Sequence, residues 1–126
     1  MPKKSDSGKL AERIAKLTLE KKAEDVIIMN LRPLSSMTDY FVICTGTTNT
    51  QVKAISDHVE KELRKKKVRP FHIEMTKNQE WILQDYFDVV LHIFQPHKRE
   101  FYNLERLWGD AETIEVTDEA LEEKSK

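Results

Sequence analysis

The chain has 126 residues, 39% of them hydrophobic, so it can bury the core of one domain but not of two. Charged residues make up 34% of the sequence yet nearly cancel, to a net charge of −1, which disfavours general nucleic-acid binding through phosphates. The single cysteine, Cys44, excludes an internal disulfide, and no apolar run approaches the about 20 residues of a membrane span. We therefore expect one cytoplasmic domain.

Helix and strand patterns alternate through the first half. The expected elements are a helix at 9–22, strands at 26–31 and 40–45, a helix at 49–67 and a strand at 71–75. Ser7 is available as the cap of the first helix. A strand, helix, strand unit favours a parallel pair joined by a right-handed crossover, which here would pair 40–45 with 71–75.

Two closely spaced apolar strands and an aromatic helix make up the second half. Strands 81–86 and 89–94 are too close in sequence for a crossover and are expected to form an antiparallel hairpin. A helix should begin near Pro96, a residue suited to the first helical position, and fray at Gly109. One face of that helix, expected to pack on the sheet, consists of Phe101, Leu104, Trp108 and Ala111.

These elements predict an α/β domain at 1–111, with a mixed β-sheet of about five strands flanked by helices. Residues 112–126 are acidic and have little to bury. We interpret them as a mostly disordered tail after a short extended piece at 113–116.

Candidates for chemistry are few. Asp85 and Asp88 could act as an acid–base or metal pair, but aspartates also close hairpin turns, and we favour the turn. His92 lies mid-strand, where a buried, hydrogen-bonded histidine is more common than a metal ligand. Cys44 has no charged neighbour that would activate it, and Gly46 lies outside any phosphate-binding motif. We therefore expect no metal and no cofactor.

A basic run at 64–67, continued by Arg69, ends the second helix. Such a run is most often a solvated helix end, favoured by the helix dipole. A local contact with RNA is the sharper alternative.

Strand 81–86 indicates a surface for a protein partner. One face carries Trp81, Leu83 and Asp85, and the other carries Ile82, Gln84 and Tyr86. Neither face is wholly apolar, so at least one should be open to solvent or to a partner. The pattern alone leaves Trp81 evenly divided between core and interface.

The hairpin, its aromatic helix and the stretch 38–46 together resemble the ribosomal silencing factor family, also called Iojap-like proteins, over roughly 10–111. The matching residues are Thr38, Asp39, Tyr40, Thr45, Gly46, Thr47, Gln51, Val52, Asp57 and His58 in the first half, and Glu74, Trp81, Asp85, Tyr86, Asp88, Val89, His92, Arg99, Tyr102, Leu104, Glu105, Leu107 and Trp108 in the second. Phe87 and Met75 depart from the family, which usually has glycine at both positions. A glycine would permit positive φ, so the hairpin turn could differ in shape here.

The resemblance implies a non-catalytic translational repressor. It would bind the large ribosomal subunit through large-subunit ribosomal protein fourteen, block joining of the small subunit, and form a homodimer. The partner-binding residues expected from it are Trp81, Leu83, Asp85, Tyr86, Asp88 and Arg99. Because the family fold is related to nucleotidyltransferases, a small nucleotide-binding or nucleotidyl-transferring enzyme is the alternative. Such enzymes need a Gly-Ser pair and closely paired aspartates, and the chain has no Gly-Ser or Asp-x-Asp sequence.

Overall fold

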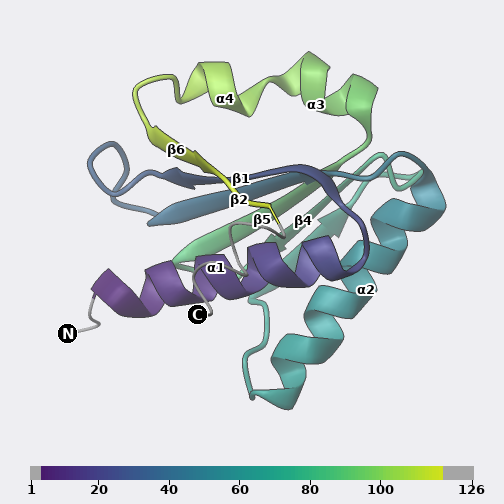
Figure 1. Cartoon of the computed structure of the whole chain (residues 1–126), viewed down its shortest axis with the longest axis horizontal. Helices are drawn as coiled ribbons and strands as arrows, with labels where there is room; N and C mark the ends of the chain where they lie inside the picture. Colours follow the sequence, from purple (N-terminus) through teal and green to yellow (C-terminus); the bar gives the residue numbers. More distant parts are fainter. Residues whose placement is uncertain (1–3, 118–126) are drawn as a thin grey trace.

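A computed structural model describes residues 4–117, which form a six-stranded mixed sheet with helices on both faces (Figure 1). Its helices are α1 (Lys4–Glu20), α2 (Asn49–Lys65), α3 (Pro96–Tyr102) and α4 (Leu104–Leu107); its strands are β1 (Glu24–Asn30), β2 (Tyr40–Thr45), β3 (His72–Met75), β4 (Trp81–Asp85), β5 (Val89–Phe94) and β6 (Glu112–Glu115). The predicted α/β class is confirmed, with six described strands where about five were expected.

The strand order is β3-β4-β5-β2-β1-β6. The expected β4–β5 hairpin is antiparallel, and β2 pairs in parallel with β5. The predicted pairing of β2 with β3 is wrong, because β4 and β5 lie between them. Every residue of β5 is buried, whereas no residue of β3 is, so β5 takes the centre of the sheet and β3 its edge.

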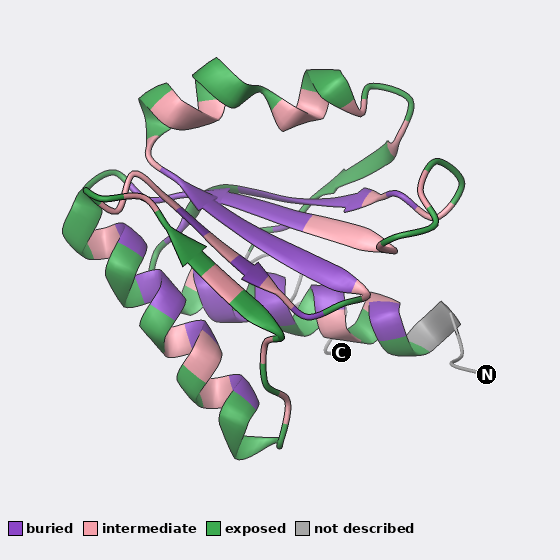
Figure 2. Cartoon of the chain, turned by 180° about the vertical axis from the view of Figure 1, so that it is seen from behind, coloured by how far each residue is buried: buried purple, intermediate pink, exposed green. Residues whose placement is uncertain are grey.

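Helices α1 and α2 cover one face of the sheet and form the main core with it (Figure 1). Figure 2 shows buried residues concentrated in the central strands and on the inner sides of these two helices. Thr48 caps α2 by accepting a hydrogen bond from the Gln51 backbone N–H at 3.0 Å. The predicted cap of α1 is wrong: Ser7 lies inside the helix, and its hydroxyl donates to Asp39 Oδ2 at 2.8 Å.

The α3–α4 segment packs on part of the other face. Leu104, Trp108 and Ala111 pack there as predicted, but Phe101 is 76% exposed, so its place on the packed face was wrong. The expected single helix is divided at Asn103, which has φ 44°. Asparagine tolerates this left-handed conformation, and its side chain accepts from the Arg106 N–H to start α4.

The sheet continues past residue 111. Strand β6 (Glu112–Glu115) overlaps the extended piece expected at 113–116 but begins and ends one residue earlier, and it pairs antiparallel with β1. Most of the predicted disordered tail, residues 118–126, lies outside the described residues. Within residues 4–117, no helix combines the length and apolar character needed to cross a bilayer.

Candidate docking surface

The sheet face that carries α3 and α4 is only partly covered. At its β3–β4 side, Trp81, Leu83 and Asp85 are half-buried, while His72 and Glu74 on the neighbouring strand are exposed. These five residues define what we call the open face. A hollow of about 270 Å³ lies on it, lined by Glu74, Met75, Thr76, Trp81 and Leu83. The alternation along β4 therefore brings together three of the six predicted partner-binding residues.

Trp81 is fixed in place by the residues beneath it. Its ring stacks on Phe94 with centroids 5.2 Å apart and contacts Tyr102 at 4.7 Å. Its indole Nε1–H donates to His92 Nδ1 at 3.2 Å. Trp81 thus packs against a small core and also lines the hollow, together with Leu83. The side chain is presented in one orientation, which lowers the entropic cost of docking a partner.

His92 is buried and neutral. Burial lowers the pKa of its imidazole to about 3, and the hydrogen bond accepted at Nδ1 leaves its proton on Nε2. Nε2 has no hydrogen-bond partner among the described residues. The ring meets Phe41 edge-on, with centroids 4.6 Å apart. The prediction of a buried, hydrogen-bonded histidine is confirmed, but its role as the acceptor for Trp81 was not visible in the sequence.

Tyr86 lies on the face of the sheet opposite Trp81, as the alternation along the strand predicted. It is 7% exposed there, so the partner contact predicted for this residue is not part of the open face. Its hydroxyl donates to Gln84 Oε1 at 2.6 Å, and Gln84 Nε2 donates to Ser56 Oγ at 2.8 Å. Burial raises the pKa of the Tyr86 hydroxyl above its usual range. The tyrosine is a structural link between the sheet and α2.

Arg99, predicted to bind a partner, makes its described contacts within the fold. Its side chain is 12% exposed, and one terminal nitrogen donates to the Asp25 carbonyl at 2.6 Å and to Thr45 Oγ1 at 2.9 Å. Nε donates to Glu105 Oε2 at 3.2 Å. Arg99 therefore ties α3 and α4 to β1 and β2, and its guanidinium is occupied within the fold.

The hairpin turn lies beside the open face. Asp85 Oδ1 accepts from the Phe87 backbone N–H at 2.8 Å, so the turn role predicted for Asp85 is confirmed. Asp88 is half-buried, and its carbonyl accepts from the Asp39 backbone N–H at 2.9 Å, which ties the turn to the start of β2. Phe87 has φ 76°, so the turn keeps a conformation suited to glycine although phenylalanine occupies it.

The open face is apolar at its centre and acidic at its rim. Trp81 and Leu83 supply the apolar surface, and Glu74 and Asp85 supply carboxylates beside it. Such a surface fits a partner with an apolar contact bordered by lysine or arginine.

The described residues offer no obvious catalytic group. Among them, no three His, Cys, Asp or Glu side chains lie close enough to hold a metal ion. Burial raises the pKa of the Cys44 thiol to about 12, which outweighs the opposing effect of the Arg99 charge and leaves the thiol protonated.

Comparisons with known proteins show which family the chain belongs to. The family model described as "Ribosomal silencing factor during starvation" matches residues 4–126. The chain belongs to the ribosomal silencing factor family. It is 39% identical over 97 residues to the ribosomal silencing factor of Halalkalibacterium halodurans, covering 77% of this chain and 83% of that protein. It is 37% identical over 92 residues to that of Bacillus subtilis, covering 73% and 78%.

Further relatives of the chain include a chloroplast protein and two proteins of known structure. The chloroplastic protein Iojap of Zea mays is 39% identical over 106 residues, which are 84% of this chain and 46% of that protein. A Bacillus halodurans crystal structure superimposes with a TM-score of 0.75 at 33% identity, covering 86% of this chain and 99% of that one. A Chromobacterium violaceum crystal structure gives 0.74 at 31%, covering 86% and 88%. The relatives named in the first two comparisons are ribosomal silencing factors, which supports a regulatory, ribosome-associated role for this chain.

Proposed function

We propose that this silencing factor docks its open face on large-subunit ribosomal protein fourteen and thereby keeps the small subunit from joining. The observation that carries the proposal is the apolar, acid-rimmed surface around Trp81 and Leu83. A protein that lies on ribosomal RNA must offset phosphate charge with lysine and arginine, so its exposed surface complements a rim of carboxylates. An aromatic anchor beside a hollow is the usual form of an interface hot spot.

Silencing by this mechanism requires only that the bound factor and the small subunit cannot occupy the same surface of the large subunit. It needs no chemical step, which agrees with a site in which Trp81 is held in place for contact. Our proposal includes action in the cytoplasm as a homodimer. The nucleotidyltransferase alternative is not favoured, because Asp85 is engaged in its turn and, within residues 4–117, no group of three or more His, Cys, Asp or Glu side chains could hold a metal ion.

Cosedimentation with purified large subunits tests the docking surface. Leu83→Glu should weaken binding about tenfold or more, because it places a charge at the centre of the apolar contact. Met37→Glu is the matched control: Met37 is 82% exposed in the loop between β1 and β2, outside the open face, and its variant should bind like the wild type. Melting temperatures show whether both variants are folded.

Isolated ribosomal protein fourteen provides the second measurement. The wild type should bind it and Leu83→Glu should not. Equal subunit binding by the Leu83 and Met37 variants would contradict the open face as the docking surface. Leu83-dependent subunit binding without any binding to protein fourteen would assign the contact to a different ribosomal protein.

A further inference from the structure

The far end of α2 carries a concentration of positive charge that the docking surface does not use. We name the residues Arg64, Lys65, Lys66, Lys67 and Arg69 the basic apex; all five are exposed. Residues 60–69 contain six basic and two acidic residues, which leaves 15 basic and 20 acidic residues in the rest of the chain. The charge near zero over the whole sequence therefore hides a strongly uneven distribution.

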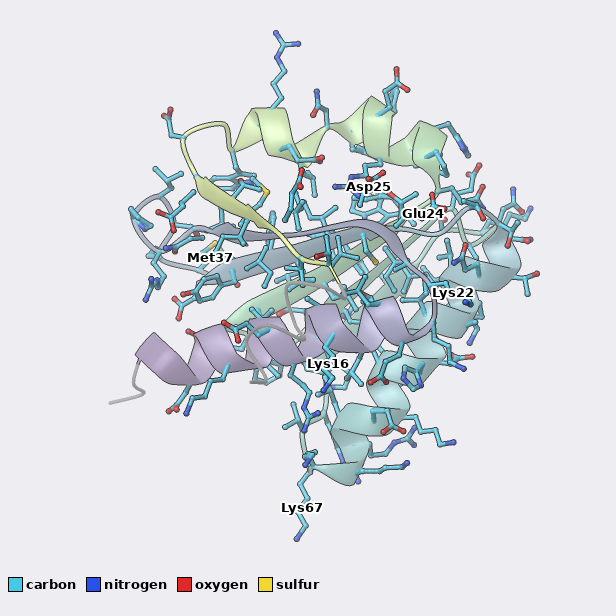
Figure 3. All side chains as sticks on the ribbon, in the orientation of Figure 1. Lys16, Lys22, Glu24, Asp25, Met37 and Lys67 are labelled. Carbon is cyan, nitrogen blue, oxygen red and sulfur yellow. The ribbon has the colours of Figure 1, made fainter. Side chains whose placement is uncertain are left out.

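The basic apex projects away from the body of the protein. Figure 3 shows Lys67 extending outward beyond the end of α2. Within the described residues, Lys65 is the one member of the apex with an ion pair, to Glu62 at 2.9 Å. Arg64 and Arg69 also line a hollow of about 220 Å³ together with Glu60, Val68 and Pro70. Two guanidinium groups beside one hollow suit a phosphate, which arginine can bind with two parallel hydrogen bonds.

An exposed aromatic pair follows the apex in the chain. Phe71 is 73% exposed and Phe87 is 60% exposed, and their ring centroids lie 5.3 Å apart. The Phe71 backbone N–H donates to the Asp85 carbonyl at 2.8 Å, which attaches this segment to the hairpin. Phe87 occupies its position despite a φ of 76°, a conformation that phenylalanine disfavours. The fold therefore keeps two large rings in solvent at a backbone cost, and burial in the core does not explain them.

We propose that the basic apex and the Phe71–Phe87 pair bind single-stranded RNA. Lysine and arginine side chains would hold its phosphates, and the exposed rings would stack on unpaired bases, which is how proteins recognise RNA loops and single strands. A protein partner would bind the rings but has no general need for five cations on one short segment. In the setting of the proposed function, the RNA is an exposed ribosomal RNA segment near the docking site; RNA binding itself does not depend on that function.

Fluorescence anisotropy with a labelled, unstructured RNA of about 20 nucleotides measures this binding directly. The triple variant Arg64→Gln/Lys66→Gln/Arg69→Gln should lose about tenfold or more in affinity, and the slope of log affinity against log salt should fall by about 2. Phe71→Ser should lose about fivefold with the salt slope unchanged, because it removes stacking and no charge.

A charge-matched control separates a site from general attraction. Lys9→Gln/Arg13→Gln/Lys16→Gln removes three exposed cations from α1, and Lys16 is visible on that helix in Figure 3. This variant should bind the RNA within about twofold of the wild type. Equal losses from the two triple variants would overturn the proposal.

The same variants distinguish this inference from the proposed docking. Leu83→Glu should keep full RNA affinity, whatever its effect on subunits. If the apex variant loses large-subunit binding but binds free RNA like the wild type, the apex contacts a protein and the RNA proposal is wrong. Circular dichroism melting curves confirm that each variant is folded, so that every affinity is read on native protein.

Discussion

Trp81 lies between the core and the open face. Its ring packs on Phe94 and Tyr102, and its N–H is held by His92, while its edge borders the hollow. The pattern left Trp81 evenly divided between core and interface, and the packing shows that its ring contributes to the core. Trp81→Ala should reduce both stability and docking, whereas Leu83 touches the hollow from a half-buried position and is the cleaner probe of docking alone.

The neutral state of His92 makes stability depend on pH. Its pKa in the fold is about 3, against an ordinary value of 6.5, so below pH 6.5 the unfolded chain binds a proton that the folded chain does not. The stabilisation that neutral His92 contributes is complete above pH 6.5 and is lost progressively as the pH falls toward 3. The free energy of unfolding should therefore fall by about 1–2 kcal/mol between pH 7 and 5. Urea unfolding at the two pH values should show a smaller loss for His92→Gln.

An NMR titration checks the same prediction without a variant. The His92 ring signal should not shift between pH 7 and 5, and the Trp81 indole N–H should stay protected from solvent exchange. A titration midpoint near 6.5 would mean that His92 is accessible to protons and that the hydrogen bond from Trp81 is not maintained.

Two substitutions at Phe87 separate the strain of its backbone from the loss of its ring contact. Residue 87 has a φ of 76°, which is unfavourable for any side chain with a Cβ atom. Phe87→Ala loses the contact with Phe71 and keeps this backbone strain, whereas Phe87→Gly loses the same contact but removes the strain. Glycine should therefore give the more stable variant by about 1 kcal/mol, despite its larger entropy loss on folding. Urea denaturation of both variants measures the difference, and an alanine variant as stable as the glycine variant would show that the turn is not strained.

Among the elements, the α3–α4 layer depends on one side chain. Arg99→Ala should lower the free energy of unfolding by about 2–3 kcal/mol, because it removes charge-assisted bonds to the Asp25 carbonyl, Thr45 and Glu105. Arg106→Ala, at an exposed position on α4, should change it by less than about 0.5 kcal/mol. If Arg99→Ala melts like Arg106→Ala yet loses subunit binding, Arg99 is an interface residue after all.

The sequence predicted most elements because periodicity reports local burial. The same alternation placed Trp81, Leu83 and Asp85 on one face of β4, and the structure keeps them together. It could not show which face α2 covers, and this decides that Tyr86 is buried. The role of Arg99 depends on contacts with Asp25 and Thr45, 74 and 54 residues away in the chain, for which local pattern carries no signal.

Two element-level errors have the same physical origin. The helix after Pro96 has a continuous apolar spacing, but the left-handed conformation of Asn103 redirects its second half. The predicted partner of β2 was β3, but β2 pairs with β5, the strand whose residues are all buried and which therefore suits the centre of the sheet. Both outcomes are set by tertiary packing, which outweighs local preference.

At the scale of the whole molecule, acidic and basic side chains are concentrated on two different surfaces, each suited to a different kind of partner. The open face offers apolar contact within a rim of carboxylates, and the basic apex offers cations beside exposed rings. A ribosomal subunit presents both basic protein surfaces and RNA, so each feature has a complementary partner there. The two contacts would also fix the orientation of the bound factor, which steric blocking requires.

Subunit joining in vitro is the most direct test of this account. Separated subunits are preincubated with saturating protein, and the joined fraction is measured on sucrose gradients. We predict that the wild type and Met37→Glu lower the joined fraction in proportion to the large subunits they occupy, while Leu83→Glu lowers it less at the same concentration because it occupies fewer of them. An unchanged joined fraction with wild-type protein shown to occupy the large subunit would contradict silencing by occlusion.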